Sequence, residues 1–146
     1  MTLPEHLSEF RGPILVSFAY VTMYYAFIIL QVACTYYLYF KAKANKKADE
    51  KVGLKNYYYD NKDPLKLTGD RAVGNTLEQM VPFLGGLWVY AVFVSTDLAT
   101  QLGWVYVICR AFYPLTFYMG PWRVLSTLPC YVVIGYYWFG AFSAAL

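Results

Sequence analysis

The sequence predicts an all-α integral membrane protein built as a bundle of four helices, and three observations support this fold class. Of its 146 residues, 59% are hydrophobic and only 14% are charged, whereas ordinary soluble domains carry about 25% charged residues. Aromatic residues reach 21%, and the charges are confined to short stretches that leave long apolar runs. A small soluble domain cannot bury this much apolar surface. The composition therefore argues against a soluble, a disordered or a disulfide-stabilised secreted protein.

The four expected membrane spans follow from those apolar runs. Residues 13–40 carry no charge and exceed the ~20 residues that a helix needs to cross a bilayer core. Further runs with few charges predict spans at 76–96, 98–119 and 124–146. Only helices or closed barrels satisfy their backbone groups in lipid, and runs this long do not alternate as barrel strands would. We therefore expect one domain over residues 1–146.

Short polar and turn-forming motifs separate the later spans. Ser95, Thr96 and Asp97 stand before the third apolar run, where such residues cap helix N-termini. Gly120 and Pro121 lie between the third run and the fourth, and this pair is a strong turn signal. The chain is thus expected to reverse direction at both places.

The basic loop between the first two spans, residues 41–70, carries eight lysines and five acidic residues. The positive-inside rule places this loop and the turn at Arg123 on the cytoplasmic side of the membrane, with both termini on the far side. The loop lacks the stripe of basic residues interleaved with base-stacking aromatics that nucleic-acid binding needs. No nucleic-acid partner is therefore expected.

Cysteine and histidine chemistry is restricted by the positions of these residues. Cys34, Cys109 and Cys130 lie far apart in apolar runs and form no C-x-x-C pair, so we expect small core residues rather than disulfides or metal ligands. His6 is the single histidine, which excludes a histidine-based zinc site or catalytic triad. No bound metal is predicted.

Three polar residues near the start of the second span form the first candidate site. Arg71, Asn75 and Glu78 are spaced i, i+4 and i+7 and so share one helical face. Charges within membrane spans are costly and mark functional sites by default. This face could hold a zwitterionic ligand, with the arginine on a carboxylate and the glutamate on an ammonium. The alternative is an internal network, in which Glu78 pairs with Arg110 and Asn75 bonds a backbone carbonyl.

A second group of polar residues lies in and after the third span. Arg110, Tyr113 and Phe117 share one face of the expected helix, and Tyr113 either hydrogen-bonds a ligand or packs between helices. Arg123 follows Trp122 at the membrane boundary. It is either an interfacial anchor that reaches toward water or a cation placed over a bound thiol.

The pattern Arg71-x-x-x-Asn75-x-x-Glu78, together with Arg110-x-x-Tyr113 and a later arginine, resembles the MAPEG family. These are the membrane-associated proteins in eicosanoid and glutathione metabolism, which include the microsomal glutathione transferases. The four spans and the basic first loop are also similar. The resemblance implies a homotrimer of four-helix subunits in the endoplasmic reticulum or another organelle membrane, with glutathione bound between neighbouring subunits near the cytoplasmic side.

The resemblance also implies roles for individual residues. Arg123 would stabilise the glutathione thiolate and is the candidate catalytic residue. The remaining candidates would bind glutathione as co-substrate: Arg71, Asn75, Glu78, Arg110, Tyr113, Lys41 and Lys43.

Two functions follow from the resemblance. The first is a glutathione-dependent transferase or peroxidase that acts on lipophilic electrophiles or lipid hydroperoxides through an activated thiolate. The alternative is a non-catalytic protein of the same fold that presents lipids or serves as a structural subunit of a larger membrane complex. Gln79 and Phe117 stand where the glutathione-using members have tyrosines, which favours the alternative. The retained trio Arg71, Asn75 and Glu78 favours the enzyme.

Overall fold

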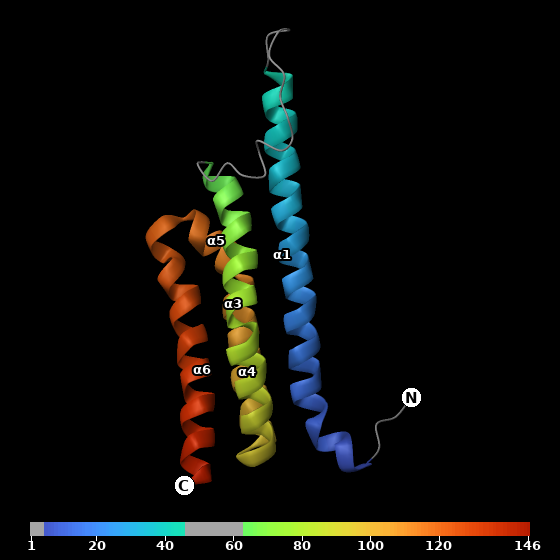
Figure 1. The fold of residues 1–146 in the computed structure, drawn as a ribbon, viewed down its shortest axis with the longest axis vertical. Helices are drawn as coiled ribbons and strands as arrows, with labels where there is room; N and C mark the ends of the chain where they lie inside the picture. The colour runs from blue at the N-terminus through green and yellow to red at the C-terminus, as the bar shows by residue number, and fades with distance from the viewer. Residues whose placement is uncertain (1–4, 46–62) are drawn as a thin grey trace.

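The computed structural model describes residues 5–45 and 63–146, and within these ranges the chain is helical with no strand (Figure 1). This confirms the predicted all-α class. A 3-10 turn leads into the first long helix, and a short helix and a second 3-10 turn precede the last. The elements are η1 (Glu5–Phe10), α1 (Arg11–Ala44), α3 (Pro64–Phe93), α4 (Thr96–Ala111), α5 (Tyr113–Tyr118), η2 (Gly120–Trp122) and α6 (Arg123–Ala145).

The long helices lie side by side along one axis. Helix α1 packs against α3 and α4, and α6 packs against the same two helices from the other side. Helix α1 begins and α6 ends at the same end of the molecule, whereas α3 begins at the opposite end, next to α5 (Figure 1). In the described part of the chain, two helical segments are long and apolar enough to cross a membrane, Ser8–Ala44 and Gly120–Ala145.

Helix α3 begins inside the segment that the sequence predicted to be a loop. The expected loop 41–70 is too long, because α1 continues to Ala44 and α3 starts at Pro64. Asp63 caps this start by accepting hydrogen bonds from the backbone N–H groups of Leu65 (2.8 Å) and Lys66 (3.4 Å), and proline is favoured in the first turn. Residues 46–62 of the expected loop lie outside the described residues.

The third predicted helix, 98–119, is interrupted. Helix α4 ends at Ala111 and α5 starts at Tyr113, with Pro114 in its first turn. Proline lacks a backbone N–H and its ring clashes with the carbonyl of the residue four positions earlier, here Arg110, which accounts for a break between the two helices. The predicted N-cap is confirmed, because the Ser95 hydroxyl accepts a hydrogen bond from the N–H of Leu98 at 3.3 Å.

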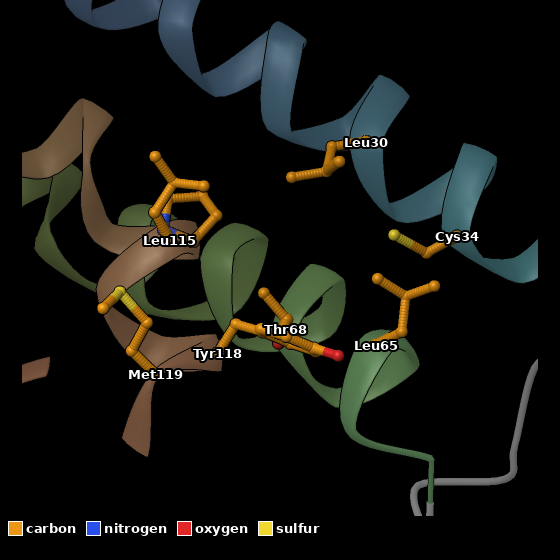
Figure 2. Close-up of a pocket in the computed structure, with 8 residues that line it drawn as sticks. Leu30, Cys34, Leu65, Thr68, Leu115, Tyr118 and Met119 are labelled. Atoms are coloured by element: carbon orange, nitrogen blue, oxygen red, sulfur yellow. The ribbon is translucent and has the colours of Figure 1, made fainter. Parts of the chain in front are cut away.

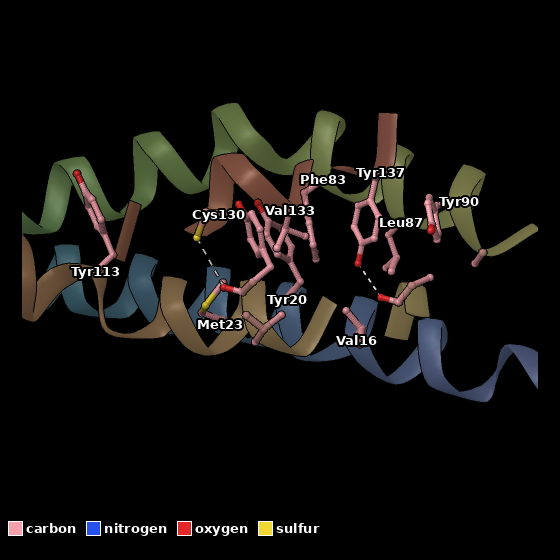
Figure 3. Close-up of a cluster of buried hydrophobic side chains, with 14 of the residues drawn as sticks. Val16, Tyr20, Met23, Phe83, Leu87, Tyr90, Tyr113, Cys130, Val133 and Tyr137 are labelled. Carbon is pink, nitrogen blue, oxygen red and sulfur yellow. Dashed lines mark hydrogen bonds between the residues drawn. The ribbon is translucent and has the colours of Figure 1, made fainter. Parts of the chain in front are cut away.

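The core combines aromatic side chains with small aliphatic ones (Figure 3), and several of its tyrosine hydroxyl groups are paired inside it. The rings of Phe83 and Tyr106 stack with centroids 3.8 Å apart. The Tyr106 hydroxyl donates to Gln79 Oε1 at 2.6 Å, and the Tyr137 hydroxyl donates to the Ala99 carbonyl at 2.6 Å. Buried polar groups are costly unless they are hydrogen-bonded, so these pairs let tyrosines pack between the helices.

The cysteines behave as the sequence predicted. Cys34 and Cys130 are buried, Cys109 is half-buried, and all three are free thiols. The Cys130 thiol donates to the Ser126 carbonyl at 3.1 Å, which is a local helix contact. The described residues contain no cluster of three or more potential metal ligands.

Close packing of α4 yields a prediction for stability. A Cβ atom added at Gly103 would lie 2.7 Å from Val16 Cγ1 and 3.3 Å from Leu87 Cδ1, so Gly103→Ala should lower the free energy of unfolding by about 1–3 kcal/mol. Gly135→Ala is the matched control, since a Cβ there meets nothing within 4 Å and alanine favours helix. Thermal unfolding in detergent measures both. Equal midpoints for the two variants would contradict the packing described here.

Candidate functional site

A polar pocket lies where α5 and the start of α6 pack beside the first turns of α3. Its volume is about 410 Å³. It contains four of the residues that the sequence singled out as site candidates, together with apolar and hydroxyl side chains. The lining residues are Leu67, Arg71, Asn75, Tyr113, Phe117, Arg123, Val124 and Thr127.

Local sequence explains how each helix contributes to this pocket. Arg71 and Asn75 are one helical turn apart on α3, as the i, i+4 spacing predicted. Tyr113 and Phe117 have the same spacing on α5. Arg123 is the first residue of α6, directly after the turn in which Gly120 adopts a positive φ of 76°, a conformation that glycine adopts without a Cβ clash.

Asn75 and Tyr113 are joined across the pocket wall. The Asn75 side-chain amide donates a hydrogen bond to the Tyr113 hydroxyl at 2.5 Å. The alternative in which Asn75 bonds a backbone carbonyl is therefore wrong. Tyr113 itself is almost fully buried, with 3% of its surface exposed, so its ring packs between helices while its hydroxyl reaches the pocket wall.

Arg110 lies beneath this wall rather than in the pocket lining. Its side chain is fully buried, its Nε donates to Thr76 Oγ1 at 3.1 Å, and its Cζ lies 4.5 Å from the centroid of the Tyr113 ring. Nη1 and Nη2 have no hydrogen-bond partner among the described residues. The structure thus separates Arg110 from the ligand-facing residues with which the sequence grouped it.

Glu78 continues the face of Arg71 and Asn75 one turn further along α3, but it is exposed and does not line the pocket. Across the described ranges no ion pair joins it to Arg110 or to any other cation. The predicted internal pair between Glu78 and Arg110 is therefore wrong. Lys41 and Lys43 are exposed near the end of α1 and also lie outside the pocket lining.

The charge of the pocket favours an anionic ligand. Arg71 and Arg123 both line it, and its lining contains no carboxylate. Both arginines are exposed, so each guanidinium is free to form two parallel hydrogen bonds with a carboxylate. Thr127 was not predicted from the sequence. Its hydroxyl adds a donor and an acceptor to the lining, and its i+4 spacing from Arg123 was the available signal.

A second pocket of about 340 Å³ lies on another side of α5 (Figure 2). Its lining contains no charged residue. The Thr68 hydroxyl in its wall is already paired, because it donates to the Pro64 carbonyl at 2.8 Å. The lining comes from α1, α3, α5 and the residue after α5: Leu30, Cys34, Leu65, Thr68, Pro114, Leu115, Tyr118 and Met119.

Comparison with protein families gives a match to the MAPEG family model over residues 15–143, nearly the whole chain. The chain belongs to the MAPEG family. This membership confirms the resemblance inferred from the residues around Arg71 and Arg110, and it identifies the chain as a membrane protein of that family. A comparison with curated proteins finds no match for this MAPEG protein.

Proposed function

We propose that this MAPEG protein binds glutathione in the polar pocket and uses it as a glutathione-dependent transferase or peroxidase. The observation that carries the proposal is the convergence of Arg71 and Arg123 on one pocket that has no carboxylate in its lining. Glutathione has two carboxylates, one ammonium group and a thiol, so its net charge is negative. A pocket with two guanidinium groups complements that charge.

The side chains of the pocket fit the parts of glutathione. Arg71 can form a two-pronged contact with a carboxylate, and Asn75 can both donate and accept hydrogen bonds with a peptide group. No carboxylate lines the pocket to pair with the ammonium group. Glu78 is exposed on the same face of α3. We propose that the chain assembles as a homotrimer in which Glu78 supplies this carboxylate to the glutathione bound by a neighbouring subunit.

Arg123 is the proposed catalytic residue. A free cysteine thiol has a pKa of about 8.5, so little thiolate forms at pH 7. A nearby cation in a site with little water favours the charged form, and the thiolate is the nucleophile. The thiolate would attack a carbon of an electrophile to form a thioether, while a leaving group departs or an activated double bond takes up a proton. With a hydroperoxide, it would attack the terminal oxygen and break the O–O bond, so that the lipid leaves as an alcohol. Glutathione is thereby oxidised to its sulfenic acid, which a second glutathione converts to the disulfide with release of water.

The proposed second substrate is lipophilic. The uncharged pocket on the other side of α5 and the exposed apolar side chains of α1 and α6 support access from the bilayer. We place the four long helices across an endoplasmic reticulum or other organelle membrane, with the basic segment after α1 and the Arg123 turn on the cytoplasmic side. Glutathione would then enter from the cytoplasm.

Glutathione binding to the purified protein in detergent tests the proposal directly. The ultraviolet absorbance of the thiolate, followed against pH, reports the pKa of the bound thiol. We expect binding with a thiol pKa clearly below the ordinary value of about 8.5. Absence of binding at millimolar glutathione would contradict the proposal.

One observation favours the non-catalytic alternative. Gln79, which replaces a tyrosine of the glutathione-using members, is buried and accepts the hydrogen bond of Tyr106, so it faces the core and not a ligand. Phe117 lines the pocket without a hydroxyl group. If glutathione fails to bind while lipids or other membrane proteins co-purify with the chain, the lipid-presenting or structural role is the better description.

A further inference from the structure

We propose that Arg110 is a positioning residue that holds the ring of Tyr113 in the wall of the polar pocket. This inference rests on the proposed function, since it assigns Arg110 a role in the glutathione site without contact to glutathione. It differs from the ligand role predicted from the sequence, because Arg110 is fully buried and absent from the pocket lining.

Arg110 is anchored at one nitrogen. Its Nε donates to the Thr76 hydroxyl at 3.1 Å. Thr76 is itself held in place, because its backbone carbonyl accepts a hydrogen bond from the hydroxyl of buried Tyr20. The guanidinium is therefore fixed between α3 and α4 at its Nε end.

The outer part of the guanidinium has the Tyr113 ring as its partner. Nη1 and Nη2 find no hydrogen bond in the described residues, whereas the ring centroid lies 4.5 Å from Cζ. The attraction between a cation and an aromatic face is strongest where water is excluded, and Arg110 has no exposed surface. Among the described residues, the Tyr113 ring is thus the close contact that stabilises the Nη1 and Nη2 end of the buried guanidinium.

Tyr113 is held at two points, and this arrangement leaves its hydroxyl proton free to hydrogen-bond a ligand. Arg110 holds its ring face, and the Asn75 amide donates to its hydroxyl oxygen at 2.5 Å. A tyrosine hydroxyl both accepts and donates. Because the oxygen accepts from Asn75 and the described residues provide no acceptor for the hydroxyl proton, that proton is available to an anionic group in the pocket.

The pair Gln79 and Tyr106 provides a matched control. It also joins α3 to α4 through one buried hydrogen bond, at 2.6 Å, and Gln79 lies about one turn from Thr76 on α3. It does not line the polar pocket. Gln79→Leu should therefore lower the midpoint of thermal unfolding without changing glutathione affinity.

A double-mutant cycle in glutathione affinity tests the proposal. The variants are Arg110→Met, Tyr113→Leu and their combination, with Gln79→Leu beside them, and calorimetry in detergent gives each Kd. Arg110→Met should weaken binding about tenfold. In the Tyr113→Leu background it should weaken binding no further, because Arg110 acts through the ring. Additive losses, or an equal loss in Gln79→Leu, would overturn the proposal.

A second readout does not depend on glutathione. With Tyr113 labelled as 3-fluorotyrosine, Arg110→Met should shift and broaden its fluorine resonance, while Gln79→Leu should leave it unchanged. If the unmodified protein binds no glutathione, the proposed function fails, and this resonance still decides whether Arg110 holds the ring. An unchanged resonance in Arg110→Met would overturn the inference. Should that variant not fold, Thr76→Val removes the Nε acceptor and should shift the resonance in the same direction.

Discussion

Arg71→Ala is expected to weaken glutathione binding by about thirtyfold or more and to leave the protein folded. Loss of one member of a buried, hydrogen-bonded charge pair costs about 2–5 kcal/mol of binding free energy, and glutathione bound between subunits would bury the Arg71 guanidinium. Arg71 is exposed and makes no ion pair among the described residues, and substitutions of such residues change stability by only about 0.5 kcal/mol. Calorimetry measures the affinity, and a thermal scan in the same detergent measures the stability.

Arg11→Ala is the matched control for this experiment. Arg11 is also exposed, but it begins α1 at the end of the molecule away from the pocket (Figure 1). Its replacement should change neither affinity nor stability. If Arg71→Ala instead unfolds the protein or dissociates the proposed trimer, Arg71 is a structural residue and the assignment is wrong.

Glu78→Ala extends the same experiment to the neighbouring subunit. In the proposed trimer, Arg71 and Glu78 of different subunits hold one glutathione, so each variant alone should lose binding. Mixed assemblies of Arg71→Ala and Glu78→Ala subunits contain some sites with both residues intact, and part of the binding should return. No recovery in mixed assemblies would contradict the intersubunit site.

Arg123→Ala is expected to lower kcat by about a hundredfold while changing the Kd for glutathione much less. Removing one preorganised group that stabilises a developing or reacting anion costs about 10²–10³ in kcat. Arg71 and Asn75 still line the pocket in this variant and, in the proposed site, would still hold the tripeptide, which is why affinity should be largely kept. Turnover with a lipophilic electrophile and the ultraviolet titration of the bound thiol are the two measurements.

Arg123→Lys tests whether the positive charge of Arg123 or the planar shape of its guanidinium stabilises the thiolate. Lysine keeps the positive charge but lacks the planar fork of arginine, so it should recover part of the thiolate absorbance at neutral pH. Unchanged turnover in Arg123→Ala would remove Arg123 from the mechanism. The residue would then be an interfacial anchor, as its position beside Trp122 also allows.

Several features of this protein were determined by the sequence alone. Long uncharged runs allow only structures that satisfy their own backbone groups, and this established the helical class. N-cap preferences predicted the Ser95 cap, and helical periodicity predicted the shared face of Arg71 and Asn75. Both predictions succeeded because they depend on residues within one helical turn. The resemblance to the MAPEG family grouped eight residues in one site, and the structure brings four of them to one pocket: Arg71, Asn75, Tyr113 and Arg123.

The tertiary structure decided which of the predicted polar residues reach the pocket. Arg110 and Tyr113 share a face as predicted, with Arg110 Cζ 4.5 Å from the Tyr113 ring centroid, but only Tyr113 lines the pocket, and Arg110 is fully buried behind it. Glu78 lies on the same helical face as Arg71 and Asn75, yet it does not line the pocket. Periodicity specifies direction around a helix axis. Whether a residue lines a pocket also depends on which side chains of the other helices fill the space beside it. The packing of the helices decides this.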